Sequence, residues 1–314
     1  MTTSATSRPP AGGRAPPQWA SAPVWAAVLA AAAFVSMDAT IKGLAPRYGA
    51  VQLSFFRFAS GAAFALVVWA LWRSPMPAAA HWRMHLARSA LLLVTLGLYF
   101  HALSLLALAQ AVAMGYTAPI FIALLAMLLL RERPTRWIWV ALVLGLAGVA
   151  VAMWPELQQS GRPRLAGLLC AGASAITFAF VMVLTRRQAQ HDAIPTFLLL
   201  QSLLPTAMLG SAALALLALS TLPAAAPWPL WQPVALSDLP AIAAVGAFAT
   251  VGLAAITWAL RHMEASRLAP VEYTGFLWAA LIGYFAFGEV PSLHTAASAV
   301  LIALGCLLLL RRGG

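Results

Sequence analysis

The chain has 314 residues, of which 62% are hydrophobic and 9% are charged, whereas an ordinary soluble domain carries roughly 25% charged residues. So few charges cannot cover a surface that faces water, and the composition therefore predicts an integral membrane protein. The net charge of +11 comes from Lys and Arg in short gaps between apolar runs, which argues against a nucleic-acid-binding face. Cys170 and Cys306 lie inside apolar runs, and we expect no disulfide, metal or cofactor.

Residues 1–21 are rich in Pro, Ser, Ala and Gly, which predicts a disordered cytoplasmic tail. The apolar run that follows is longer than the 7–15 residues typical of a signal-peptide core, so it predicts a retained first helix. Because the apolar runs are continuous rather than alternating, they exclude a transmembrane barrel. Ten segments approach the length of about 20 residues that a spanning helix needs. Their approximate bounds are 22–43, 51–72, 86–107, 109–130, 137–154, 164–185, 194–219, 237–260, 268–288 and 293–310.

Lys and Arg residues indicate the orientation of the spans, because positive charge is retained on the cytoplasmic side of a membrane. With a cytoplasmic N-terminus, 14 of the 19 Lys and Arg residues fall on that side, and Arg88 near the start of the third span is one of them. Four fall on the opposite side, namely Lys42, Arg47, Arg162 and Arg164. This split predicts an even number of spans in a bacterial inner membrane, with both termini, including residues 311–314, in the cytoplasm.

The two halves of the chain resemble each other when one is shifted by 157 residues. This shift places Tyr116-Thr117 on Tyr273-Thr274. It also aligns Glu132 with Glu289 and Pro134 with Pro291. Such matches at one offset indicate an internal repeat, with one five-helix unit at 22–154 and another at 164–310. Because five is odd, the second unit enters the membrane from the opposite face. The predicted fold is an all-α integral membrane protein of ten transmembrane helices in two inverted five-helix repeats.

Residues 109–154 and 264–312 share a pattern of an Ala-rich start, GYTAPIF or PVEYTGF, a Leu/Phe run that closes on Glu, and a Gly-punctuated final helix. In this pattern the chain resembles the drug/metabolite transporter superfamily, in its branch of EamA-like ten-helix carriers. Residues 37–58 resemble the first hairpin of relatives assigned to uptake of S-adenosylmethionine or riboflavin. The resemblance implies secondary transport without ATP hydrolysis, which agrees with the absence of a Gly-x4-Gly-Lys-Ser/Thr loop from the sequence.

A charged side chain at mid-membrane costs about 2.5–3.5 kcal/mol on insertion scales, so each one needs a reason. Asp38 and Arg57 each lie about six residues, or roughly 9 Å, from the outer ends of the first two spans, so their depths match and permit an ion pair. In the functional interpretation they line an outer vestibule, where Asp38 binds a cation or a coupling proton and Arg57 binds a substrate carboxylate or phosphate. In the alternative, Arg57 snorkels to the headgroups and Asp38 pairs with Lys42.

Five more residues complete the candidate site. Glu272 either lines the cavity, as a substrate ligand or coupling group, or complements the start of the ninth helix. Tyr116 and Tyr273, which are equivalent in the repeat, either bracket a planar or cationic ligand or pack as ordinary aromatic residues. Tyr99 on the third span is a further candidate for substrate binding. His101 on the same span either couples transport to protons or packs within the bundle.

These features favour a secondary transporter that moves a small polar organic metabolite by alternating access, coupled to protons or to exchange. An exporter of amino acids or toxic small molecules is the alternative within this class. A membrane-embedded enzyme is disfavoured because Asp and Glu total eight and do not cluster, and a channel is disfavoured because the sequence lacks rings of like charge. The expected partners are a small-molecule substrate and the lipid bilayer but no nucleic acid, and the sequence leaves open whether the chain forms a homodimer.

Overall fold

The computed structural model describes residues 22–77, 81–106, 108–159, 165–220, 231–288, 290 and 292–312. Within these ranges the chain forms helices and turns but no strand. The elements are α1 (Ala22–Leu44), α2 (Ala50–Trp72), α3 (Trp82–Leu105), α4 (Leu108–Gly115), α5 (Ala118–Leu129), α6 (Arg136–Gln159), α7 (Leu165–Ala189), α8 (Ile194–Ser220), η3 (Leu236–Asp238), α9 (Leu239–His262), α10 (Ala265–Leu268), η4 (Ala269–Tyr273), α11 (Thr274–Phe287) and α12 (Leu293–Arg312). The expected N-terminal tail and Glu289 lie outside the described residues.

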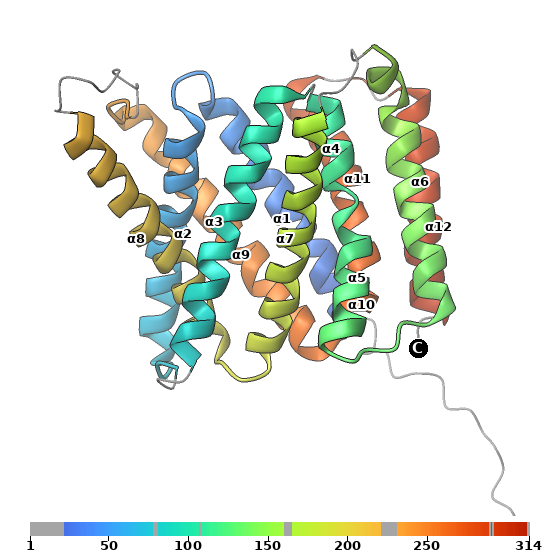
Figure 1. Cartoon of the computed structure of the whole chain (residues 1–314), viewed down its shortest axis with the longest axis horizontal. Helices are drawn as coiled ribbons and strands as arrows, with labels where there is room; N and C mark the ends of the chain where they lie inside the picture. Colours follow the sequence, from blue (N-terminus) through green and yellow to red (C-terminus); the bar gives the residue numbers. More distant parts are fainter. Residues whose placement is uncertain are drawn as a thin grey trace, which may run out of the picture.

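Ten passes form an antiparallel bundle (Figure 1). Eight segments of the described chain are long and apolar enough to cross a membrane, and α12 contains a shorter apolar helix, Leu293–Leu309. The remaining pass is assembled from α10, η4 and α11. This arrangement confirms the predicted all-α fold of two inverted five-helix repeats. Large apolar side chains that are exposed on the isolated chain, such as Leu71, Val143 and Leu214, suit a surface that faces lipid.

The fourth and ninth passes are broken, whereas continuous helices were predicted. Tyr116-Thr117 separates α4 from α5, and Tyr273-Thr274 forms the junction of η4 and α11. In both breaks the threonine hydroxyl donates to the carbonyl oxygen three residues back, at 2.6 Å for Met114 and 2.7 Å for Val271. Local bonds of this kind compete with regular helix geometry. The repeated Tyr-Thr pair therefore marks an equivalent break in each repeat.

Helix packing follows the two-fold relation between the repeats. α6 packs against α12 and α2 against α8, and α1 packs on α9 as α3 packs on α7. The α6–α12 contact is reciprocal. A Cβ atom built on Gly148 would lie 3.1 Å from the carbonyl oxygen of Ser298, and one built on Gly305 would lie 3.1 Å from that of Ala141. The 157-residue shift relates Gly148 to Gly305, and it also relates Ala141 to Ser298. Glycine at both positions lets the helices approach closely.

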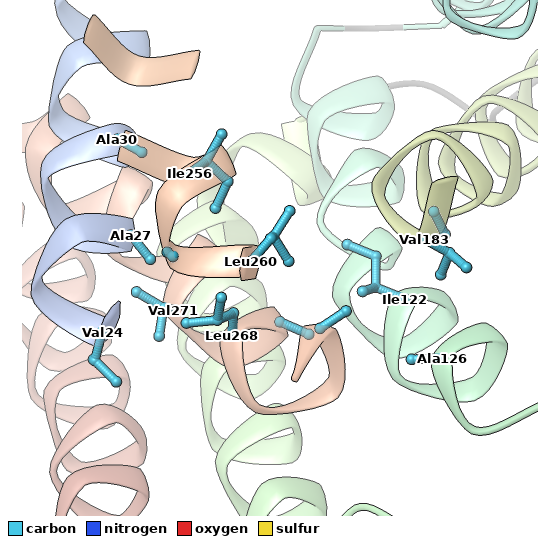
Figure 2. Packing of buried hydrophobic residues seen from close by; sticks show 14 of the residues in the cluster. Val24, Ala27, Ala30, Ile122, Ala126, Val183, Ile256, Leu260, Leu268 and Val271 are labelled. Carbon is cyan, nitrogen blue, oxygen red and sulfur yellow. The ribbon is translucent and has the colours of Figure 1, made fainter. Parts of the chain in front are cut away.

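The largest apolar core lies toward the end of the bundle where α1 begins and α12 ends, which we call the terminal end; the other end is the distal end. Figure 2 shows this core with residues of α1 beside residues of α9 and η4, and with Ile122 of α5 near Val183 of α7. Several core residues also line the central cavity described below, namely Ala27, Ala30, Leu253, Ile256 and Leu268. The core therefore forms the wall of that cavity toward the terminal end.

Candidate functional site

A cavity of about 320 Å³ lies between the two repeats. Its wall comes from α1, α2 and α3 of the first repeat and from α7, α8, α9, α10, η4 and α11 of the second. The charged residues on this wall are Asp38 of α1, Arg57 of α2 and Glu272 of η4. Most of the remaining wall is apolar, so these three charges dominate what the cavity can recognise.

Asp38 and Arg57 face the same cavity, in agreement with their matching depths in the sequence. The Asp38 side chain is exposed although it lies well inside the α1 span, because the cavity reaches it. Asp38 and Arg57 interact electrostatically. However, the ion pairs closer than 4 Å among the described residues do not include this pair. The Arg57 guanidinium instead lies 5.6 Å from the ring centroid of Phe58. Both charges are therefore available to a ligand.

Glu272 reaches the cavity from η4, the 3-10 segment that interrupts the ninth pass. This segment begins at Ala269 with Pro270 in its first turn, where a missing backbone N–H is tolerated. Broken helices expose backbone and side chains at mid-membrane only where they line a cavity or are covered by protein. The carboxylate of Glu272 therefore lies at a helix break that lines the cavity.

Tyr116 and Tyr273 meet where the two helix breaks approach each other. Their rings stack with centroids 6.2 Å apart and an interplanar angle of 26°. Tyr273 is fully buried because its ring lies against Gly145 of α6, where any Cβ atom would overlap it. Tyr116 interacts electrostatically with both Asp38 and Glu272. The two rings thus pack on each other beside the charged groups, and they do not bracket an open space.

The remaining candidates lie on α3. Tyr99 is half-buried and interacts electrostatically with Asp38, whereas His101 is exposed two residues further along. Among the residues that the structure describes, the cavity wall includes neither of them, nor Tyr116 or Tyr273. The structure therefore brings the three charged candidates together at the cavity, places the tyrosines next to it, and leaves His101 apart.

The wall also carries polar groups without charge. Thr185 and Ser202 carry hydroxyls, and Gln201 has a buried side-chain oxygen that lacks a hydrogen-bond partner within the described chain. Hydroxyls in membrane helices commonly bond to their own backbone, as Thr185 does with the carbonyl oxygen of Val181 at 2.8 Å. Such residues have no sequence signal that separates a ligand contact from a packing role.

Glu132 caps a helix of the other repeat at the terminal end. Its two carboxylate oxygens accept hydrogen bonds from the backbone N–H groups of Ala265 at 3.0 Å and Ser266 at 2.9 Å, at the start of α10. The Arg186 guanidinium lies 3.7 Å away and also donates to the carbonyl oxygen of Leu260. Glu132 is buried, so these bonds tie α5, α7, α9 and α10 together.

Among the described residues, no three His, Cys, Asp or Glu side chains are grouped closely enough to hold a metal ion. The cavity thus offers charge, hydrogen bonds and apolar contact. Charges of both signs on one wall are suited to holding a solute reversibly.

A solute-sized cavity between two inverted repeats of membrane-spanning helices defines a membrane transporter. The chain belongs to the EamA-like transporter family, whose model matches residues 21–154 and, a second time, residues 165–311. This membership agrees with the resemblance seen in the sequence.

Characterised relatives include transporters of small metabolites. The chain is 26% identical over 288 residues to the pseudopaline exporter CntI of Pseudomonas aeruginosa strain UCBPP-PA14, covering 91% of this chain and 94% of the exporter. It is 23% identical over 265 residues to the S-adenosylmethionine uptake transporter of Rickettsia bellii, covering 84% and 85% of the two chains. A solved crystal structure with 22% identity and a TM-score of 0.70 covers 92% of this chain and 96% of its own, and it shares the fold.

Proposed function

We propose that this protein is a secondary transporter for a small amphoteric metabolite, meaning one that carries both a carboxylate and a cationic group. The observation that carries this proposal is the pair of carboxylates and the single guanidinium on the wall of one cavity of about 320 Å³. Cavities that bind small molecules have volumes of roughly 300–1,000 Å³, so the space suits a metabolite rather than a macromolecule.

Charge complementarity supports an amphoteric substrate. A charge at this depth is costly unless it is paired, and Asp38 and Arg57 do not satisfy each other at close range. The guanidinium of Arg57 can bind a carboxylate through two parallel hydrogen bonds. Asp38 and Glu272 can each bind an ammonium or another cationic centre. A ligand with both kinds of group therefore compensates charges that the empty cavity leaves separated.

Alternating access is the mechanism that this architecture supports best. The wall is built from both repeats, so a change in their relative arrangement can open the same cavity first to one end and then to the other. The charge asymmetry of the sequence supports a cytoplasmic terminal end in a bacterial inner membrane. A single chain supplies the whole described wall, so the proposed site does not require the homodimer that the sequence leaves open.

The relatives support transport of a small metabolite but not one direction of transport, because one is named as an exporter and another as an uptake transporter. An exporter of amino acids or toxic compounds remains the alternative. A counterflow assay in proteoliposomes is suited to this case, since exchange of labelled for unlabelled solute reports saturable binding whichever direction dominates in the cell.

The test combines binding and transport. Purified protein is screened for thermal stabilisation by amphoteric, purely anionic, purely cationic and neutral metabolites, because a ligand that prefers the folded state stabilises it. We expect stabilisation and counterflow only with amphoteric compounds, and loss of both in Asp38→Asn and Arg57→Gln but not in Ser211→Ala, an exposed control on α8. Saturable counterflow of a solute that carries a single kind of charge would overturn the substrate class. Flux that does not saturate and shows no counterflow would overturn the carrier.

A further inference from the structure

A cluster at the distal end ties the turn between α1 and α2 to the start of α9, and we call it the arginine latch (Arg47, Tyr48, Gln52 and Asp238). The Arg47 guanidinium lies 2.5 Å from one oxygen of Asp238, and the Tyr48 hydroxyl donates to the other oxygen at 2.8 Å. The side-chain amide of Gln52 donates to the carbonyl oxygen of Gln232 at 2.7 Å and accepts from its backbone N–H at 2.9 Å. The first repeat is thereby fastened to the second.

A second cluster at the terminal end ties the turn between α7 and α8 to the start of α3, and we call it the histidine latch (His81, His85, Asp192 and Thr196). Nε2 of His85 lies 3.1 Å from one oxygen of Asp192, and Nδ1 of His81 lies 3.4 Å from the other. The Thr196 hydroxyl donates to the carbonyl oxygen of Pro75 at 2.7 Å, in the segment that leads into α3.

The two latches occupy equivalent positions in the inverted repeats. α1 and α2 are the first two passes of one half, and α7 and α8 are the first two of the other, while α3 and α9 are the third passes. Each latch therefore joins the first turn of one repeat to the third pass of the other. Figure 1 shows the α1–α2 turn and the start of α9 at one end of the bundle, and the α7–α8 turn and the start of α3 at the opposite end.

Their chemistry differs. The arginine latch holds a cation that stays charged throughout the physiological pH range, whereas an unperturbed imidazole titrates near pH 6.5. The histidine latch is also the drier of the two: the side chain of His85 is 0% exposed and that of Asp192 is 3% exposed, whereas that of Arg47 is 60% exposed. A change of charge is therefore more consequential in the histidine latch than in the arginine latch.

The charges around the histidine latch balance only when both imidazoles are neutral. Arg88 of α3 is fully buried, its guanidinium lies 5.3 Å from the ring centroid of Phe197 on α8, and no described residue accepts a hydrogen bond from it. Its positive charge balances the negative charge of Asp192. Burial disfavours a protonated His85 most strongly, Asp192 attracts it, and Arg88 repels it. His81 is the more accessible imidazole, with a side chain that is 35% exposed and a ring centroid 5.8 Å from that of His191.

We propose that the histidine latch is a proton-binding site whose protonation releases the terminal end of the transporter. With neutral imidazoles the formal charges of Arg88 and Asp192 cancel, and each oxygen of Asp192 faces one imidazole nitrogen. A proton on His85 adds an uncompensated positive charge among buried groups beside Arg88, and hydration of the opened latch relieves it. Protons therefore bind the open form more tightly than the closed form, so acidification opens the terminal end.

This inference rests on the proposed alternating-access function but is tested without a solute. Ser89, which is fully buried on α3 next to Arg88, serves as the reporter after substitution Ser89→Cys in a Cys170→Ala, Cys306→Ala background. The rate of maleimide labelling is measured from about pH 5.5 to 8, the range in which an imidazole changes charge. This rate is divided by the labelling rate of an Arg187→Cys control. Because position 187 is exposed, the rate of the control follows the ionisation of its thiol, and the division corrects for that ionisation.

We expect the corrected rate to rise on acidification, by up to about tenfold per pH unit for one linked proton. In His81→Gln, His85→Gln the response should be lost, while Tyr48→Phe in the arginine latch should leave it unchanged. Should the double variant fail to fold, Arg88→Gln provides an independent readout. Removing the neighbouring positive charge lets Asp192 compensate a protonated imidazole in the closed form, so the rise of the labelling rate on acidification should shrink.

Three results would overturn the proposal: a corrected rate that does not change with pH, a rate that falls on acidification, or a pH response that survives in the double histidine variant. Failure of this kind with intact counterflow would remove the proton site and leave the proposed transport function standing. Failure of counterflow with a normal labelling response would remove the proposed transport function and leave the proton site standing.

Discussion

The ring of Tyr116 stacks on the ring of Tyr273, its equivalent 157 positions later, so the broken helices of the two repeats meet at a pair of identical side chains. The contact depends on Gly145, because the Tyr273 ring fills the space that a side chain on that residue would occupy. The position of the Glu272 carboxylate depends on the same junction, since it is the residue before Tyr273 in η4.

Gly145→Ala should therefore destabilise the protein. The added methyl group overlaps the Tyr273 ring, and overpacking of this kind costs about 1–3 kcal/mol. Gly97→Ala on α3 is the matched control, because a Cβ atom there meets nothing within 4 Å. Thermal unfolding in detergent measures both. Equal melting temperatures for the two variants would show that Tyr273 is not held where the structure places it.

Asp38→Asn and Arg57→Gln should each abolish ligand-induced stabilisation and counterflow, and the double variant should not recover them. The reason is that the two groups are too far apart to form a direct pair and are proposed to bind different parts of the substrate. Arg57→Lys should also be impaired, because an ammonium cannot replace the two parallel hydrogen bonds of a guanidinium.

The stability of these variants without ligand distinguishes the alternatives. Breaking a buried ion pair costs about 3–5 kcal/mol, and removing both charges restores part of that loss. We expect smaller losses in the single variants and no restoration in the double variant. A double variant that is more stable than both single variants would establish a direct Asp38–Arg57 pair.

Glu132→Gln should destabilise the terminal end. The carboxylate presents an oxygen to each of two backbone N–H groups, whereas the amide of glutamine has one acceptor oxygen and would leave a buried donor unpaired, at about 1–3 kcal/mol. Glu264→Gln is the control, because Glu264 is partly exposed and its ion pair with Arg267 at 3.0 Å is of the surface type, worth about 0–1 kcal/mol. Comparable losses in the two variants would argue against the capping role.

Tyr48→Phe should weaken the arginine latch by about 0.5–1.5 kcal/mol for each bond lost, because the hydroxyl donates to Asp238 and accepts from the backbone N–H of Ala235. The ring packing on Phe56 remains. The hydrogen bond with Asp238 holds the pKa of Arg47 above its ordinary value, so the cation persists throughout the accessible pH range. The loss should consequently be equal at about pH 6 and pH 8, where only groups such as histidine titrate. Tyr284→Phe, at an exposed site on α11, is the control. A loss that changes between the two pH values would contradict a permanently charged latch.

Both termini should lie in the cytoplasm, as the distribution of Lys and Arg predicts. A fluorescent protein fused after Gly314, which folds only in the cytoplasm, should be bright, and alkaline phosphatase at the same position, which is active only in the periplasm, should be silent. The reverse result would invert the bundle and place the histidine latch on the periplasmic side.

The number of passes and the inverted repeat could be predicted because each depends on local sequence: runs of about 20 apolar residues and a shared pattern at one offset. The breaks were not predicted as breaks, although the Tyr-Thr pairs that mark them were found, because a single hydroxyl that bonds to the backbone has little effect on apolar periodicity. Arg88 was assigned to the cytoplasmic side from its place in the sequence, yet the structure buries it within α3.

The charged part of the candidate site could be predicted, since Asp38, Arg57 and Glu272 are rare charges inside apolar runs and they share one cavity. The role of an aromatic or neutral residue could not be predicted from the sequence, because a tyrosine is equally compatible with ligand binding and with packing. Tyr273 lies against a glycine 128 positions earlier in the chain, and no local pattern announces that contact. The latches likewise join distant segments, so neither was visible in the sequence.

Gly148 of α6 faces Ser298 of α12, and Gly305 of α12 faces Ala141 of α6 in the same way. When the two repeats exchange their arrangements, each of these two contacts takes the place of the other, so the α6–α12 contact as a whole is unchanged. In the proposed alternating-access cycle, a contact with this property would have the same geometry in the inward-facing and in the outward-facing form. It can therefore serve as a fulcrum about which the rest of the bundle tilts. Substitutions at these glycines would raise the free energy of both conformers together, so they would lower the amount of folded carrier without biasing which way it faces.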